Sequence, residues 1–152
     1  MSVDINPSVM MTINIYNRVI NTKPLNDDAE ILLSKTDVSG MSVSESMDEL
    51  IKKSEEIGYL NEHNKDVIVE VVDGIGKIKL PDKNYGDVEV IIENADKADL
   101  KNAKEMGVSI AKARAIAEYT KQNGGSIEEN VHKLENPVSY THLRAHETAA
   151  NL

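Results

Sequence analysis

Four neighbouring residues near the start of the chain have types and a spacing that could cut a peptide bond: Asp4, Asn6, Pro7 and Ser8. Proline has no N–H, so the backbone attack that begins ordinary deamidation cannot occur at Asn6-Pro7. The reverse attack remains available. The Asn6 carboxamide nitrogen can add to its own main-chain carbonyl, close a succinimide and expel the Pro7 nitrogen. The dipeptide therefore predicts chain cleavage without a separate enzyme.

Asp4 and Ser8 are the candidate assistants of this reaction. Side chains alternate across a strand, so Asp4 shares a face with Asn6 and could accept a proton during cyclisation. The same spacing equally suits a solvated strand carboxylate. Ser8 could donate to the developing oxyanion or could itself attack the Asn6 carbonyl, but a serine nucleophile normally needs a base. No His is nearby in the sequence, so cyclisation is favoured.

The plain alternative is that Asn6-Pro7 is only a turn, since this dipeptide commonly interrupts strands. Asn136-Pro137 is the same dipeptide placed after a predicted helix, and we expect it to be inert. Two factors could distinguish the first dipeptide from the second. One is backbone strain imposed by the fold, and the other is positioning of the carboxamide on the carbonyl carbon.

Alternating and β-branched runs predict the strands that would hold these residues. Residues 2–5 and 9–15 read as strands, the second half-buried, and a turn at 16–18 leads into a hairpin partner at 19–22. A later run, 66–72, predicts a strand buried on both faces in mid-sheet. Two further strands are expected at 77–80 and 87–92.

Capping signals predict the helices. Asn26 can cap a short helix ending near residue 35, and the Ser42/Glu45 capping box opens a longer one that stops at Gly58. The later helical patterns cover residues 98–106, 110–121 and 127–134. The order of sheet and then helices predicts an α+β domain over residues 2–135. We expect an antiparallel-rich mixed sheet of about five or six strands with helices packed on it.

Composition excludes several classes of function. The chain has 152 residues, a formal charge of −9 and a pI near 4.9, which argues against a nucleic-acid partner. It has no Cys, and its four His form no metal motif, because His142 and His146 lack a third ligand in view. We therefore predict no cofactor and no metal. No apolar run reaches membrane-spanning length, so the chain as given is expected to be soluble.

The sequence resembles the extracytoplasmic domain of RsgI-like bacterial anti-sigma factors over roughly residues 2–135. The motifs that carry the resemblance are Asp4-Ile5-Asn6-Pro7-Ser8, Lys23-Pro24-Leu25-Asn26-Asp27-Asp28-Ala29, Gly40-Met41-Ser42-Val43, Ile57-Gly58-Tyr59-Leu60 and Val67-Ile68-Val69-Glu70-Val71-Val72-Asp73. The resemblance implies self-cleavage between Asn6 and Pro7, with the two pieces held together by the sheet. Separation of the pieces would then expose a membrane stub to intramembrane proteolysis and free a sigma factor.

The same resemblance implies a membrane helix and a sigma-binding segment upstream of Met1. Residues 136–152 instead resemble a peptide translated from sequencing-adapter DNA, and we expect them to be a non-native or disordered tail. Two other functions remain open. One is a non-enzymatic interaction domain in which a sheet edge recruits a partner strand. The weaker one is a hydrolase, for which no nucleophile, base and orienting group can be assembled. Any catalysis would be a single turnover.

Overall fold

A computed structural model describes residues 1–5, 7–74, 78, 80, 83–127 and 129–130. Its sheet has five strands in the order β3-β2-β1-β4-β5. The strands are β1 (Ser2–Asp4), β2 (Ser8–Ile13), β3 (Val19–Pro24), β4 (Asp66–Val71) and β5 (Glu89–Asn94). The helices are α1 (Asp27–Lys35), α2 (Val43–Ile57), α3 (Lys97–Met106) and α4 (Ile110–Asn123). The predicted α+β class is confirmed.

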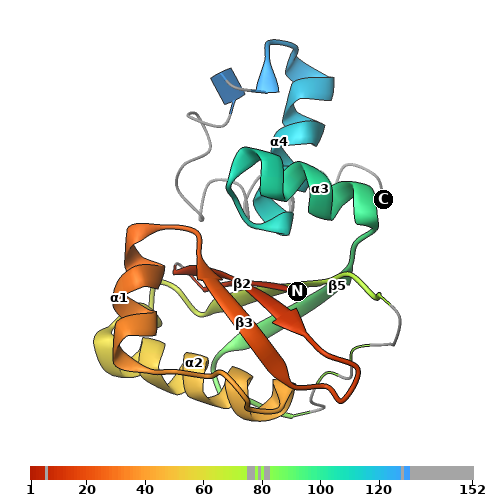
Figure 1. Cartoon of the computed structure of the whole chain (residues 1–152). Coiled ribbons are helices and arrows are strands. Elements are labelled where there is room, and N and C mark those ends of the chain that lie inside the picture. Colours follow the sequence, from red (N-terminus) through yellow and green to blue (C-terminus); the bar gives the residue numbers. More distant parts are fainter. Residues whose placement is uncertain (6, 75–77, 79, 81–82, 128, 131–152) are drawn as a thin grey trace.

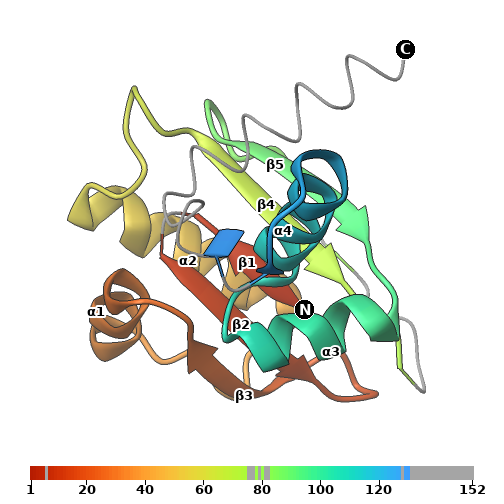
Figure 2. The ribbon, with the colours of Figure 1, turned by 90° about the horizontal axis from the view of Figure 1, so that it is seen from above.

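The short strand β1 occupies the middle of the sheet, between β2 and β4 (Figure 2). It is antiparallel to both neighbours, with Val3 opposite Val9 on one side and Val69 on the other. Among the strands of the described residues, β4 and β5 alone pair in parallel, so the sheet is mixed and mostly antiparallel. The strand that carries the start of the candidate site is therefore paired along both of its edges.

Helices cover both faces of the sheet, with α1 and α2 on one side and α3 and α4 on the other (Figure 1). The larger core lies under α1 and α2, where Val3 and Met11 from the sheet pack with Met47 and Leu50 of α2. Two smaller apolar clusters join α3 and α4 to the opposite face, one of them centred on Ile68. Both faces of β1 are consequently buried.

The capping signals read from the sequence for the first two helices are confirmed. Asn26 caps α1 by accepting a hydrogen bond from the Ala29 N–H at 2.9 Å. The Ser42/Glu45 capping box is formed at the start of α2, and Gly58 ends that helix with a φ of +99°. Only a residue without a Cβ adopts this left-handed conformation readily, which explains a glycine at that position.

One predicted strand differs from the structure in two details, its end and its burial. The strand expected over 9–15 ends at Ile13, and Ile15 is 68% exposed beside the turn. Its first half is buried on both faces rather than half-buried, because α3 packs over Met10 on the side away from α1 and α2. β4, in contrast, is buried in mid-sheet as predicted.

Three predictions fall wholly or largely outside the described residues: the strand at 77–80, the helix at 127–134 and the tail at 136–152 with its Asn-Pro dipeptide and two histidines. Within the described ranges, no helix is long and apolar enough to cross a membrane. No group of three or more His, Cys, Asp or Glu side chains in those same ranges is arranged to hold a metal ion.

Candidate site at the β1–β2 hairpin

The predicted scissile bond belongs to the tight connection between β1 and β2. The strand register places Asp4 opposite Ser8, which leaves residues 5–7 as the link between them. The backbone N–H of Ile5 donates to the Pro7 carbonyl at 2.9 Å and closes this link. Residue 6 itself lies outside the described residues. The chain is thus fixed by hydrogen bonds on both sides of the predicted cleavage point.

Asp4 and Ser8, which the sequence offered as separate assistants, are in direct contact. The Ser8 hydroxyl donates to Oδ1 of Asp4 at 2.5 Å. Asp4 is 3% exposed and Ser8 is 8% exposed. The alternative of a solvated carboxylate at Asp4 is therefore wrong. The contact also gives Ser8 a base in reach, which sequence spacing did not reveal.

The carbonyl of Ile5, immediately before the Asn6 amide, is held by a residue 59 positions later. Nδ2 of Asn64 donates to the Ile5 oxygen at 3.1 Å and to the Tyr59 oxygen at 2.9 Å. Asn64 is half-buried, in the loop that precedes β4. In the sequence this asparagine reads only as a flank of the strand, because nothing local signals a contact with Ile5.

The N–H of Ser8, on the other side of the scissile bond, is held by the cap of α1. Oδ1 of Asn26 accepts from the Ser8 N–H at 3.2 Å as well as from the Ala29 N–H. The Ser8 carbonyl also accepts from the Leu25 N–H at 2.9 Å. Asn26 was predicted as a helix cap, and its second bond to the hairpin becomes visible only once β2 and β3 are paired.

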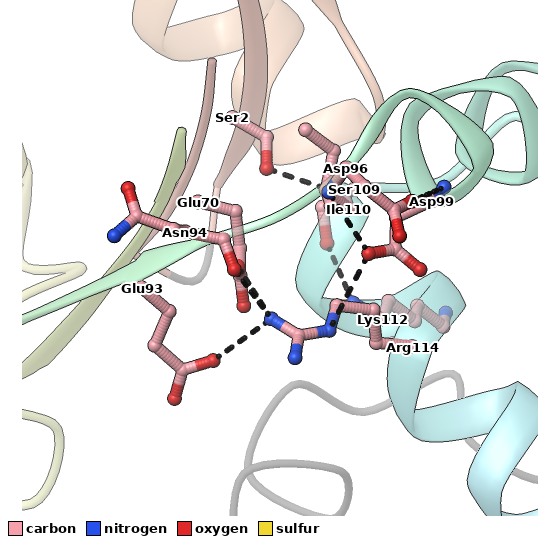
Figure 3. A network of polar contacts seen from close by, with 10 residues as sticks. All are labelled: Ser2, Glu70, Glu93, Asn94, Asp96, Asp99, Ser109, Ile110, Lys112 and Arg114. Atoms are coloured by element: carbon pink, nitrogen blue, oxygen red, sulfur yellow. Dashed lines mark hydrogen bonds and ion pairs between the residues drawn. The ribbon is translucent and has the colours of Figure 1, made fainter. Parts of the chain in front are cut away.

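The opposite end of β1 is fixed to α4 (Figure 3). The hydroxyl oxygen of Ser2 accepts from the Ile110 N–H at 3.2 Å. Beside Ser2 in the sheet register lies the fully buried Glu70, which binds Nη1 of Arg114 at 3.0 Å. Arg114 reaches Glu93 as well, at 3.4 Å. This polar network joins β1, β4, β5 and α4 on one face of the sheet.

The first residue extends the ladder of β1 by one step. The Met1 amino group donates to the Met11 carbonyl at 3.1 Å, and the Met11 N–H donates to the Met1 carbonyl at 2.7 Å. Burial, with a smaller contribution from Lys104, lowers the pKa of this amino group to about 6. The start of β1 is therefore held in the sheet by the same pattern of bonds as its centre.

These features define an α+β domain in which a buried central strand leads into a short link whose described residues, Ile5 and Pro7, are hydrogen-bonded to each other. Comparison with known families identifies the domain further. Residues 1–118 match the RsgI-like anti-sigma factor central domain family. The chain belongs to this family, and it is a regulatory anti-sigma factor domain.

Several similar proteins come from Acetivibrio thermocellus. Anti-sigma-I factor RsgI9 is 29% identical over 155 aligned residues, which cover 99% of this chain and 20% of that protein. Anti-sigma-I factor RsgI5 is 38% identical over 45% of this chain and 14% of its own length. RsgI6 is 34% identical over 44% of this chain and 9% of its own length. The chain spans a fifth or less of these three relatives.

Proposed function

We propose that this domain is the extracytoplasmic part of a transmembrane anti-sigma factor and that it cleaves its own chain at Asn6-Pro7. The observation that carries the proposal is the buried hydrogen bond between Asp4 and Ser8, which spans the base of the hairpin containing that bond. A carboxylate and a hydroxyl on either side of an Asn-Pro bond are groups that can move protons during cyclisation.

The proposed reaction transfers one proton and consumes no water. Nδ2 of Asn6 forms a bond to its own carbonyl carbon, and the bond from that carbon to the Pro7 nitrogen breaks. Asp4 accepts the proton released by Nδ2, and the Pro7 nitrogen gains a proton as it leaves. The products are a succinimide at residue 6 and a free secondary amine at residue 7. Once Asp4 is protonated it no longer needs the Ser8 proton, and the Ser8 hydroxyl turns from Asp4 to donate to the developing oxyanion.

The position of β1 supports a regulatory use of this cut. After cleavage, the first piece would still be paired with β2 and β4 and bonded to Ile110 through Ser2. Each hydrogen bond contributes only about 1 kcal/mol net, so such a strand is stable at rest and can still be withdrawn by force. Withdrawal would carry the signal through an upstream membrane helix, and proteolysis within the membrane would then release a sigma factor.

Intact mass under denaturing conditions tests the proposed cleavage. The chain is prepared with a short N-terminal extension, beside its Asn6→Ala variant. We expect two pieces meeting at Asn6 and Pro7 in the parent and one uncut chain in the variant. The N-terminal piece should first appear one water lighter than a hydrolysis product, because it ends in the succinimide.

Other outcomes would contradict the proposal in distinct ways. Cleavage that persists in Asn6→Ala but is lost in Ser8→Ala would assign the attack to the Ser8 hydroxyl, with Asp4 as its base. A single uncut mass in the parent and the variant would favour a non-enzymatic interaction domain. In that case the edge strand β3, whose Ile20 is 58% exposed, would be the first surface to test for a partner strand.

A further inference from the structure

We infer that Asn64 and Asn26 are positioning residues for the cleavage, one holding the chain before the scissile bond and the other holding it after. We call them the anchoring amides. This inference rests on the proposed self-cleavage and adds to it two residues that are distant in sequence from the hairpin. Neither one supplies a proton or a nucleophile in the reaction.

Two backbone groups that flank the scissile bond are held by side chains from outside the hairpin. Nδ2 of Asn64 binds the carbonyl of Ile5, the peptide group that leads directly into residue 6. Oδ1 of Asn26 binds the N–H of Ser8, the peptide group that follows Pro7. The link of residues 5–7 is thus held from outside at its first carbonyl and at the first N–H beyond it. The Ile5 N–H to Pro7 carbonyl bond closes it from within.

The anchoring amides are themselves fixed by the surrounding fold. Asn64 also binds the Tyr59 carbonyl, and its own backbone pairs with Asn61 through two hydrogen bonds of 3.0 and 3.2 Å. Asn26 is held by the first turn of α1 through the Ala29 N–H. Each amide therefore ties a backbone group of the hairpin to another part of the fold, Asn64 to the loop before β4 and Asn26 to the start of α1.

Cyclisation is sensitive to such restraint because a five-membered ring closes only when the amide nitrogen lies over the carbonyl carbon. An ångström of misplacement can reduce the rate of an oriented reaction by about a hundredfold. A flexible Asn-Pro link would sample that geometry rarely. Loss of either anchor should therefore slow cleavage far more than it lowers the population of folded chains.

The test uses the fact that the two amides act through opposite atoms. Asn→Asp keeps the size and the acceptor oxygen of the side chain but removes the donor N–H groups. Asn26 accepts, so Asn26→Asp should cleave within about twofold of the parent, and Asn26→Ala should be slowed. Asn64 donates, so Asn64→Asp should be slowed by about tenfold to a hundredfold.

Asn61→Asp is the matched control for Asn64→Asp. Asn61 lies in the same loop, and its Nδ2 also donates to a backbone oxygen, that of Gly58 at 3.0 Å, but it does not bind Ile5. This variant loses a comparable hydrogen bond and gains a comparable charge. It should cleave within about twofold of the parent if contact with Ile5 is what matters.

Rates are measured by pulse labelling in cell-free translation of the chain behind a small tag protein, with the two pieces separated on a denaturing gel. Folding is measured separately, by urea unfolding of each variant in an Asn6→Ala background. A purely structural effect lowers the rate only in proportion to the folded fraction. We expect Asn64→Asp to remain mostly folded while its cleavage rate falls. Asn64→Gln, which keeps the donor, should recover part of the rate.

The outcomes separate this inference from the proposed function. If the parent chain is not cleaved, the proposed self-cleavage and the role of the anchoring amides are both wrong. If the parent is cleaved and Asn64→Asp cleaves as fast as the parent or as Asn61→Asp, the anchoring role of Asn64 is wrong while self-cleavage stands. The role is equally wrong if Asn64→Gln is no faster than Asn64→Asp. Equal slowing by Asn26→Asp and Asn26→Ala would overturn the role of Asn26.

Discussion

Among the individual residues, the contact between Asp4 and Ser8 changes the interpretation of the hairpin most. From spacing alone, the carboxylate was equally consistent with a solvated strand position, and the hydroxyl had no base. In the folded chain each is the other's partner, and both are buried. Burying a carboxyl group is costly unless it is hydrogen-bonded, and the Ser8 hydroxyl supplies such a bond to Asp4.

Asp4→Asn tests directly whether Asp4 acts as a base, because it preserves the shape of the side chain and removes its basicity. We expect the cleavage rate to fall by about a hundredfold, the lower range for loss of a general base. Ser8→Ala should slow cleavage less, since the hydroxyl assists without attacking. Both rates are followed by intact mass after pulse labelling.

Ser46→Ala provides the control for the serine substitution. Ser46 is also fully buried, and its hydroxyl donates to the Val43 carbonyl at 2.8 Å within α2 rather than to a group of the hairpin. It should leave the cleavage rate close to that of the parent. A rate in Asp4→Asn equal to the parent's would remove Asp4 from the mechanism.

Local signals predicted the described helices and the hairpin of β2 and β3, but they did not predict the neighbours of β1. The caps of α1 and α2 follow from side chains within three residues of each helix start, and they were found where expected. The pairing of β1 with β4 joins residues more than 60 positions apart, and no local pattern encodes it. For the same reason Asn64 was not recognised as part of the site.

The ion pair between α4 and β4 should contribute to the stability of the fold. Arg114→Met removes the cation bound to the fully buried Glu70, so the free energy of unfolding should fall by about 3 kcal/mol. The double variant with Glu70→Gln should recover part of the loss, because the buried charge is then absent. The measurement is urea unfolding in the Asn6→Ala background.

Lys121→Met, at an exposed position of the same helix, should change the stability by less than about 0.5 kcal/mol. If Arg114→Met proves equally mild, the network in Figure 3 contributes little to holding α4 against β4. The cleavage rate of Arg114→Met would then be expected to match that of the parent.

For the whole molecule, the buried start of β1 makes stability depend on pH. The pKa of the Met1 amino group is lowered from 8.0 to about 6 by burial, with Lys104 adding to the effect. Between pH 6 and 8, the Met1 amino group is therefore protonated to a greater extent in the unfolded chain than in the folded chain. In a chain that begins at Met1, stability should rise as pH increases from 6 to 8, by at most about 2 to 3 kcal/mol.

Urea unfolding at several pH values checks this dependence, with an N-terminally extended chain as the control. The extension replaces the amino group by a peptide bond, so the rise between pH 6 and 8 should disappear. A rise of equal size in both chains would assign the dependence to other titrating groups.

The central place of β1 also sets the order of events during synthesis. The first strand leaves the ribosome with nothing on its β4 side, because the residues that pair with it there lie more than 60 positions later. Asn64 and Asn26 likewise emerge after the hairpin they hold. The ribosome adds about 5 to 20 residues per second. The Asn6-Pro7 bond, one of the first peptide bonds made, is therefore exposed for seconds before β4 has been synthesised. If folding of the domain drives the cleavage, cleavage of the nascent chain is delayed until these later residues have been synthesised. A chain interrupted before residue 64 would then remain uncut.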